Sequence, residues 1–440
     1  MPFSTLPPEM VYQIILHAVK ERGIKRAGRL RYVSKSWDAT VLDAICVSGV
    51  LDAIYVSRVW DRRVIPNCPY ISRYFAQRIM GRPQTLCTLR IIRQVAARII
   101  SHRNKGRDDG DSYDALRDCV FDLCRLWIEF KSPCLDYWFR CEKSLTQPFD
   151  ENDERFLQAL LAAAAWTNEV ALVHELLPFF RDSPHMISLR PGDPTTFSPV
   201  FGYPIPMAAR RGHNEIMSLL IDAVITNGFR DHFVLGEALW SAVRGNQLST
   251  VELILKPQLI LESGFYNSCL HHGLRHTADI NIFKRLAPIA RGQDFWILSR
   301  WVCDAASNGN LAILKHLIEE EGAKPTEWEW PLEEAARNGR MDALVYLLRK
   351  GFPLRPGLPL SAAKSRNPDV MRVIIEAGTQ QNTYLEPGPA LVTATEREND
   401  RVVRLLLRCE HVKINDEYKA RALQRAEELG LESMAEMLDC

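Results

Sequence analysis

A short unit of two helices, clearest at residues 331–351 (PLEEAARNGRMDALVYLLRKG), constrains this chain more than any other feature. Pro331 favours a helix start, because a residue at the first helical position has no intrahelical partner for its N–H. Ala335 and the alanine after it give the first helix little side-chain bulk, so a neighbouring helix pair can pack closely against it. Gly339 and Gly351 end the two helices, since glycine accepts the positive φ that a helix C-terminus often requires.

The second helix of this unit is amphipathic, because Leu344, Leu347 and Leu348 share one helix face. Two short helices cannot bury such a face alone, so a chain built from this unit needs several stacked copies. The position of Ala335, called the marker here, recurs at Ala164, Ala208, Ala242, Leu274, Ala305, Ala335, Ala362, Ala394 and Ala426. Six of the eight gaps between successive markers are 30 to 34 residues long.

The same register predicts apolar residues nine, twelve and thirteen positions after each marker. Four clear sets are Val173, Leu176 and Leu177; Met217, Leu220 and Ile221; Leu314, Leu317 and Ile318; and Val403, Leu406 and Leu407. Period and internal pattern together predict an all-α protein whose C-terminal two-thirds is a helical solenoid.

These units resemble ankyrin repeats. The dipeptides at 204–205 and 331–332 stand where that family has Thr-Pro-Leu, and residues 208–213 (AARRGH) match its Ala-Ala-x-x-Gly-His. Residues 411–415 (HVKIN) are similar to its Ala-Asp-Val-Asn ending, and the resemblance covers about residues 156–440.

The resemblance implies an ankyrin-repeat solenoid of about nine degenerate units, in a domain at residues 151–440, that holds a target protein on its concave side. Three departures from the family pattern are visible. Arg366 and Glu398 replace the turn glycine, and the unit at Leu274 lacks the alanine pair.

The N-terminal 50 residues contain two apolar helical faces. Pro7 and Pro8 precede a helix whose Met10, Val11, Ile14, Ile15 and Ala18 share one face, and Leu30, Val33 and Trp37 line a later helix. From these residues alone, a small helical cap or a three-helix domain packed on itself is the favoured interpretation.

The order of these residues is similar to the F-box motif over about residues 3–50, with Leu-Pro-x-Glu at 6–9 and Leu-Arg-x-Val-Ser-Lys-x-Trp at 30–37. The resemblance implies an F-box-like domain at residues 1–50 that docks on the Skp adaptor of a cullin–RING ubiquitin ligase. By position, the residues that would make or support this contact are Leu6, Pro7, Ile14, Ile15, Leu30, Val33 and Trp37.

The two resemblances together imply a substrate-recruiting adaptor, with a Skp-type adaptor and a cullin as partners and an unknown target protein on the array. Two alternatives remain open. The chain is then an ankyrin scaffold without a ligase role, whose N-terminal helices only cap the array, or a membrane or nucleic-acid binder acting through its basic N-terminal region.

That basic region is the first 110 residues, which hold 19 Lys and Arg against 8 Asp and Glu, although the whole chain has a net charge of +1. Residues 51–150 are expected to form a helical linker region. Within it, residues 85–103 form a basic amphipathic helix, and we favour a helix packed beside the F-box-like segment over a membrane or nucleic-acid element. No nucleic-acid partner is expected.

No pattern in the chain predicts catalysis, a cofactor or a metal. Cys119, Cys124, Cys134 and Cys141 are spaced too widely for a typical zinc site, and Gly273 stands where a zinc protease of the His-Glu-x-x-His type has its glutamate between His272 and His276. Asp108, Asp109 and Asp111 lack the later glutamate of a calcium loop. We therefore expect a protein without enzymatic activity.

Eleven cysteines without a secretory signal indicate a reducing compartment, so the expected location is cytoplasmic, nuclear or both. No run of about 18 apolar residues occurs, so no membrane span is expected. Aromatic and arginine side chains, which dominate binding hot spots, cluster near the first helices of the repeats. The predicted target-binding residues are Tyr203, Arg210, Arg211, Arg244, Trp296, Trp301, Trp328, Trp330 and Arg337.

Overall fold

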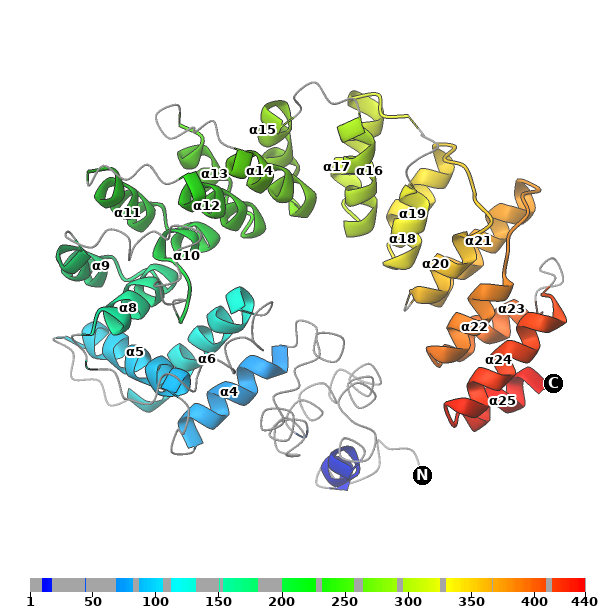
Figure 1. Ribbon diagram of the computed structural model, residues 1–440, viewed down its shortest axis with the longest axis horizontal. Coiled ribbons are helices and arrows are strands. Elements are labelled where there is room, and N and C mark those ends of the chain that lie inside the picture. Colours follow the sequence, from blue (N-terminus) through cyan, green and yellow to red (C-terminus); the bar gives the residue numbers. More distant parts are fainter. Residues whose placement is uncertain are drawn as a thin grey trace. The chain divides into compact units, whose positions relative to one another are not determined.

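The computed structural model shows a helical repeat protein (Figure 1). It describes residues 10–17, 44, 69–81, 87–105, 112–131, 150, 153–180, 200–226, 232–256, 264–290, 296–324, 330–365, 367–408 and 414–439. All regular structure within these ranges is helical, as the sequence predicts. The chain divides into two compact units, Met1–Ser241 and Ala242–Cys440, and each is described by itself. The boundaries predicted near residues 50 and 150 stay predictions.

The first unit contains a helix at 10–17 and a series of longer helices coloured blue to green in Figure 1. These are α4 (Pro69–Gly81), α5 (Cys87–Arg103), α6 (Ser112–Lys131), α8 (Glu154–Thr167), α9 (Val170–Leu176), the 3₁₀ turn η5 (Leu177–Phe180), α10 (Pro204–Arg211) and α11 (Asn214–Thr226). Helices α4, α5 and α6 pack against one another, α5 also packs on α8, and α8 packs on α10.

The basic amphipathic helix of the sequence is α5, and its apolar face is buried. Leu89, Ile92, Ala96 and Ile99 are buried, whereas Arg93 is exposed. Since α5 contacts α6 and α8, this face is covered by the chain itself and leaves no broad apolar stripe for a membrane surface. The expected neighbour was the F-box-like segment; the observed neighbours include the helix that opens the repeats.

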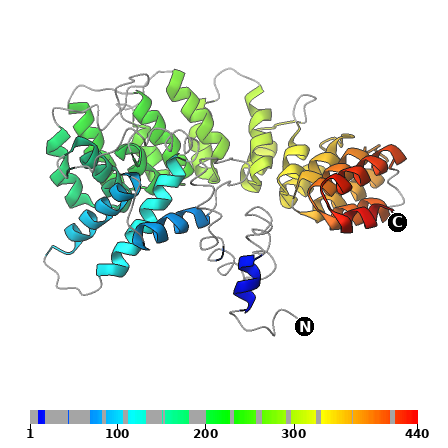
Figure 2. The same cartoon turned by 60° about the horizontal axis from the view of Figure 1, so that its bottom comes forward.

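The second unit is a stack of helix pairs in two layers, coloured green to red in Figure 1 and seen from another side in Figure 2. Helix α12 (His232–Arg244) crosses the boundary between the units. It is followed by α13 (Leu248–Ile254), α14 (Gly264–His276), α15 (Ile280–Ala290), α16 (Trp296–Asn308), α17 (Leu311–Lys315), the π-helical turn η7 (His316–Glu320), α18 (Pro331–Arg337), α19 (Met341–Arg349), α20 (Leu358–Lys364), α21 (Pro368–Gln380), α22 (Gly388–Glu396), α23 (Asp400–Arg408), α24 (Asp416–Glu428) and α25 (Glu432–Asp439).

Each layer is formed by one member of every pair. The first helices α14, α16, α18, α20, α22 and α24 contact one another in chain order, and so do the second helices α13, α15, α17, α19, α21 and α23. The small marker residues allow the first layer to pack closely, since Ala335, Ala362, Ala394 and Ala426 are fully buried. The stacking predicted from the repeat is therefore confirmed in this unit.

The predicted apolar register is confirmed at two of its three positions. Nine residues after the first eight markers, the buried side chains are Val173, Met217, Val251, Phe283, Leu314, Leu344, Met371 and Val403. Twelve residues after them, they are Leu176, Leu220, Ile254, Leu286, Leu317, Leu347, Ile374 and Leu406. The thirteenth position is at the edge of the buried face, because Ile221, Leu255 and Ile375 are buried there while Leu348 is only half-buried.

The turn inside each pair has one left-handed residue, four positions after the marker. Its φ is 64° at Asn168, 78° at Gly212, 57° at Asn246, 77° at Gly309, 69° at Gly339, 54° at Glu398 and 64° at Gly430. In the same turn the N–H of the next residue donates to the marker carbonyl, as from Arg340 N to Ala335 O at 2.8 Å. Glu398 thus adopts the conformation that glycine takes elsewhere, whereas Arg366 lies outside the described residues.

The marker assigned to the weakest unit is wrong by one residue. Gly273, not Leu274, takes the position of the small marker, because a Cβ on Gly273 would lie 3.3 Å from Val243 Cγ2 of the neighbouring helix. The following turn is one residue shorter, and Thr277 N donates to Gly273 O without a left-handed residue between them. This deletion restores the register for Phe283 and the rest of the second helix.

Hydrogen bonds between successive units repeat with the period of the sequence. Asn310 Nδ2 donates to Thr277 O at 2.6 Å, Arg340 Nε donates to Ser307 O at 3.2 Å, and Arg397 Nη1 donates to Lys364 O at 2.6 Å. Each pair is separated by 33 residues. Side chains of one turn therefore satisfy carbonyl groups at the helix end of the preceding unit.

Candidate binding surfaces

The helix at 10–17 presents two of its apolar side chains outward. Met10 and Ile14 are one helical turn apart and are 52% and 41% exposed, whereas Ile15 is only 1% exposed. Ile14 is therefore available to a partner, while Ile15 is buried within the chain. The other predicted adaptor-binding residues, Leu6, Pro7, Leu30, Val33 and Trp37, lie outside the described residues.

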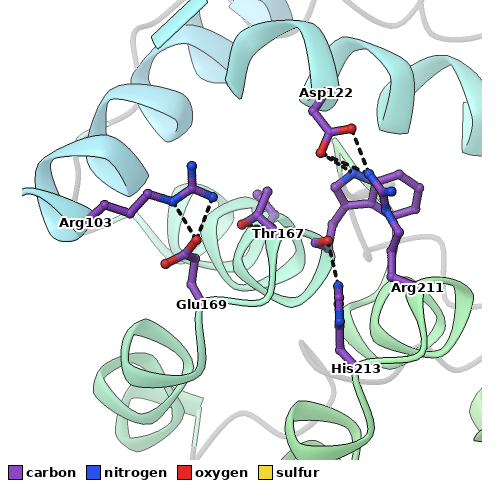
Figure 3. Close-up of polar contacts among 8 residues, drawn as sticks. Arg103, Asp122, Thr167, Glu169, Arg211 and His213 are labelled. Atoms are coloured by element: carbon purple, nitrogen blue, oxygen red, sulfur yellow. Dashed lines mark hydrogen bonds and ion pairs between the residues drawn. The ribbon is translucent and has the colours of Figure 1, made fainter. Parts of the chain in front are cut away.

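A polar cluster joins α6 to the first repeats of the first unit (Figure 3). Asp122 of α6 accepts hydrogen bonds from Arg211 Nη2 at 2.8 and 3.0 Å and from Trp166 Nε1 at 3.1 Å. The Arg211 guanidinium also stacks on the Trp166 ring, 4.1 Å from its centroid. His213 Nε2 lies 3.2 Å from Trp166 O. This cluster, called the α6 junction below, ties three helices together.

Two further ion pairs hold α5 and the residues after it against the first repeat. Arg103 Nε donates to Glu169 Oε1 at 2.7 Å (Figure 3). Glu175 accepts a hydrogen bond from Lys105 Nζ at 3.1 Å, and His102 Nε2 lies 3.3 Å from the same oxygen. The hydrogen bond from Lys105 lowers the pKa of the Glu175 carboxyl. These contacts and the buried face of α5 make the predicted linker helices a cover for the first repeat.

The α6 junction changes the role predicted for Arg211. Its side chain is one-third exposed, but its guanidinium is engaged by Asp122 and Trp166, so binding a target through it would break internal contacts. Tyr203 and Arg210, on the same helix end, are half-buried. Burial raises the pKa of the Tyr203 hydroxyl, so this group stays neutral at physiological pH.

The second unit carries basic side chains at equivalent positions of stacked first helices. The members of this basic row, each two residues after a marker, are Arg244, Arg275, Arg337 and Lys364. Arg244 and Arg337, both predicted to bind a target, are exposed. Acidic residues one position before the markers pair with two members of the row, Asp304 with Arg275 at 3.0 Å and Glu334 with Arg337 at 3.3 Å.

Burial perturbs two acidic groups beside this row. Desolvation raises the pKa of Asp304 above its ordinary value, although Arg275 opposes the shift. Desolvation also raises the pKa of Glu333, which lies on α18 with its side chain turned into the stack. Perturbed carboxyls inside a cleft often mark functional sites, but buried repeat positions produce the same shift.

The predicted tryptophans separate into different environments. Trp301 is 4% exposed and packs edge-to-face on Phe283, with ring centroids 5.4 Å apart, so its assignment to an open binding surface is wrong. Trp330 is 52% exposed at the N-terminus of α18, and the Arg355 guanidinium lies 5.3 Å from its ring centroid. Trp296 is the first residue of α16. Trp328 lies outside the described residues.

The groups considered for metal binding are placed differently from one another. Cys119 and Cys124 are buried in α6, and burial raises the pKa of the Cys119 thiol to about 12, so both behave as small apolar residues. His272 and His276 are exposed, with ring centroids 5.9 Å apart. Within the described residues, no group of three or more His, Cys, Asp or Glu side chains is arranged to hold a metal.

Comparison with known proteins gives limited similarity. No known family model matches the chain. A segment of 108 residues, 23% of the chain, is 35% identical to the ankyrin repeat and KH domain-containing protein mask-1 of Caenorhabditis elegans, and it spans 4% of that protein. A solved structure of the pentatricopeptide repeat protein PPR10 in complex with an 18-nt psaJ RNA element covers 98% of the chain and 74% of its own chain, at 13% identity and a TM-score of 0.22. At that score the likeness carries no argument.

The sequence interpretation missed two parts of these surfaces. Arg275 and Lys364 belong to the basic row, and the signal for Arg275 was Gly273, the small residue that sets the register of that unit. The α6 junction joins Asp122 to Arg211, which is 89 residues away, and no local pattern predicts such a pair. No helix in the described part of the chain is both long and apolar enough to cross a bilayer.

Proposed function

We propose that this chain is a substrate-recruiting adaptor of a Skp–cullin–F-box type ubiquitin ligase. The observation that carries the proposal is the pair of exposed apolar side chains, Met10 and Ile14, directly after the Leu-Pro-x-Glu sequence at residues 6–9. Exposed apolar side chains on one helix face are typical of a surface that a partner covers. The Skp adaptor and a cullin are the proposed partners.

We propose that the repeats are ankyrin repeats and that they hold the target. Support comes from the left-handed turn residue four positions after seven markers and from the hydrogen bonds between residues 33 positions apart. The 35% identity to a protein named for its ankyrin repeats agrees with this. The proposed target surface of the second unit comprises Arg244, Arg337 and the exposed Trp330.

Affinity purification of the full-length protein followed by quantitative mass spectrometry tests the proposal. The Skp adaptor and a cullin should co-purify with the unmodified chain. Ile14→Asp should abolish their recovery, because burying a carboxylate without a partner costs several kcal/mol. Gln13→Asp is the matched control, since Gln13 is exposed on the same helix and adds the same charge outside the predicted apolar face.

Target binding should separate from adaptor binding. Arg337→Glu reverses a charge on the proposed target surface and should release targets while the Skp adaptor stays bound. If neither the Skp adaptor nor a cullin is recovered at a depth that detects other partners, the ligase role is refuted.

The second candidate function is an ankyrin scaffold without a ligase role. It is favoured by the packing of α5 on α8, because terminal elements of a repeat array commonly cover its apolar end. In that case target recovery depends on Arg337 and Trp330, and Ile14→Asp leaves the partner list unchanged.

A further inference from the structure

A pocket of about 270 Å³ lies in the second unit, between the helices of two successive repeats. Its walls come from α15, from the first half of α16 and from the π-helical turn η7. Phe283, Leu298, Trp301 and Leu317 provide apolar walls, and Ala287 leaves space at one side. The pocket is smaller than a typical site for a whole small-molecule ligand, and its size suits one large apolar side chain.

The π-helical turn gives the pocket a polar edge. Glu321 N donates to His316 O at 3.1 Å, which closes the wide turn. His316 Nδ1 then lies 2.9 Å from Glu320 Oε2, and its Nε2 lies 3.6 Å from Glu321 Oε1, so one imidazole contacts both carboxylates. His316 itself is 9% exposed and packs edge-to-face on Phe283. Wide turns of this kind are frequent at functional sites.

The charge at this edge is unbalanced. The lining side chains include two carboxylates, Glu320 and Glu321, and one ammonium, Lys284. Lys284 Nζ lies 3.1 Å from Glu320 Oε2, and its hydrogen bond lowers the pKa of Glu320 and keeps that group ionised at neutral pH. A cationic side chain placed beside this edge would therefore meet net negative charge.

We propose that this pocket binds a linear segment of a partner protein, taking one large apolar side chain inside and a nearby lysine or arginine at the Glu320–Glu321 edge. Peptide segments commonly bind through such a combination of a buried apolar anchor and a charged neighbour. The proposal does not depend on the ligase role, because the pocket lies away from the helix at 10–17 and from the basic row.

The test is a selection of random displayed peptides on the immobilised full-length protein, followed by anisotropy measurements with the recovered peptides after fluorescent labelling. Recovered peptides should pair Leu, Ile, Met, Phe or Trp with Lys or Arg within a few positions. Ala287→Leu fills the pocket and should weaken their binding by at least about tenfold, the effect of losing one buried apolar anchor. Ala312→Leu, an exposed change on α17 outside the pocket, should leave binding unchanged.

A second variant keeps the test informative if Ala287→Leu disturbs folding. Glu321→Lys changes the partly exposed edge and should weaken the same peptides and favour versions in which Glu replaces their Lys or Arg. The proposal is overturned if no peptide is enriched, if the recovered peptides are acidic or lack a large apolar residue, or if binding is insensitive to both Ala287→Leu and Glu321→Lys.

Discussion

Replacing Gly339 with alanine tests the turn geometry on which the repeat register depends. Gly339 has a φ of +69°, and a Cβ there would lie 2.9 Å from Ser365 Oγ of the next unit. The left-handed conformation costs about 1–2 kcal/mol for a residue with a Cβ. Ser365 Oγ accepts a hydrogen bond from Asn367 N at 2.9 Å, so displacing it adds about 1 kcal/mol.

Alanine also stabilises the protein by restricting the unfolded chain, by about 0.4–1 kcal/mol. The expected net effect of Gly339→Ala is thus a loss of about 2 kcal/mol in the free energy of unfolding. Gly351→Ala is the matched control, because Gly351 has a φ of +77° but nothing within 4 Å of an added Cβ. It should lose only about 1 kcal/mol.

Urea unfolding of the full-length variants, followed by far-UV circular dichroism, measures both losses. The transition slopes should be compared with that of the parent, since a repeat array can unfold in more than one step. Equal losses for Gly339→Ala and Gly351→Ala would refute the proposed contact between neighbouring turns. A gain in stability for either variant would refute the left-handed assignment.

Three further changes test other parts of the structure. Ala335→Leu should cost about 1–3 kcal/mol by overpacking the first layer, and thermal unfolding checks this. Burial raises the pKa of Glu333 above 4.5, so its ionisation destabilises the folded chain as pH rises through that region, and Glu333→Gln should raise the melting temperature at neutral pH but not in acid. Burial lowers the pKa of His213 below 6.5, so stability should fall as pH drops below that value, and His213→Gln should reduce this fall in a pH series of melting temperatures.

Much of the fold could be predicted because its determinants are local. A stacked helix pair needs apolar side chains on one face and a tight turn, and Leu344, Leu347 and Gly339 show both within one unit. The register also contained the correct location of Trp301, four positions before its marker. Pro331 takes the same position in its own unit, and both side chains are buried. Closeness to a first helix was the wrong criterion.

The remaining features depend on contacts between distant segments. Asp122 meets Arg211 only because α6 packs beside the first repeats, and no pattern in α6 identifies that neighbour. The pocket beside Trp301 depends on the π-helical turn at His316, which one extra residue creates in an otherwise regular second helix. Such features arise from packing and could not be read from period or composition.

The most direct test of the proposed adaptor role is binding between the purified full-length chain and a purified Skp adaptor, measured by isothermal titration calorimetry. The account predicts a saturable one-to-one complex that Ile14→Asp weakens by at least about tenfold and that Gln13→Asp leaves unchanged. Absence of binding by the folded, unmodified chain, or equal binding by the Ile14→Asp variant, would contradict it.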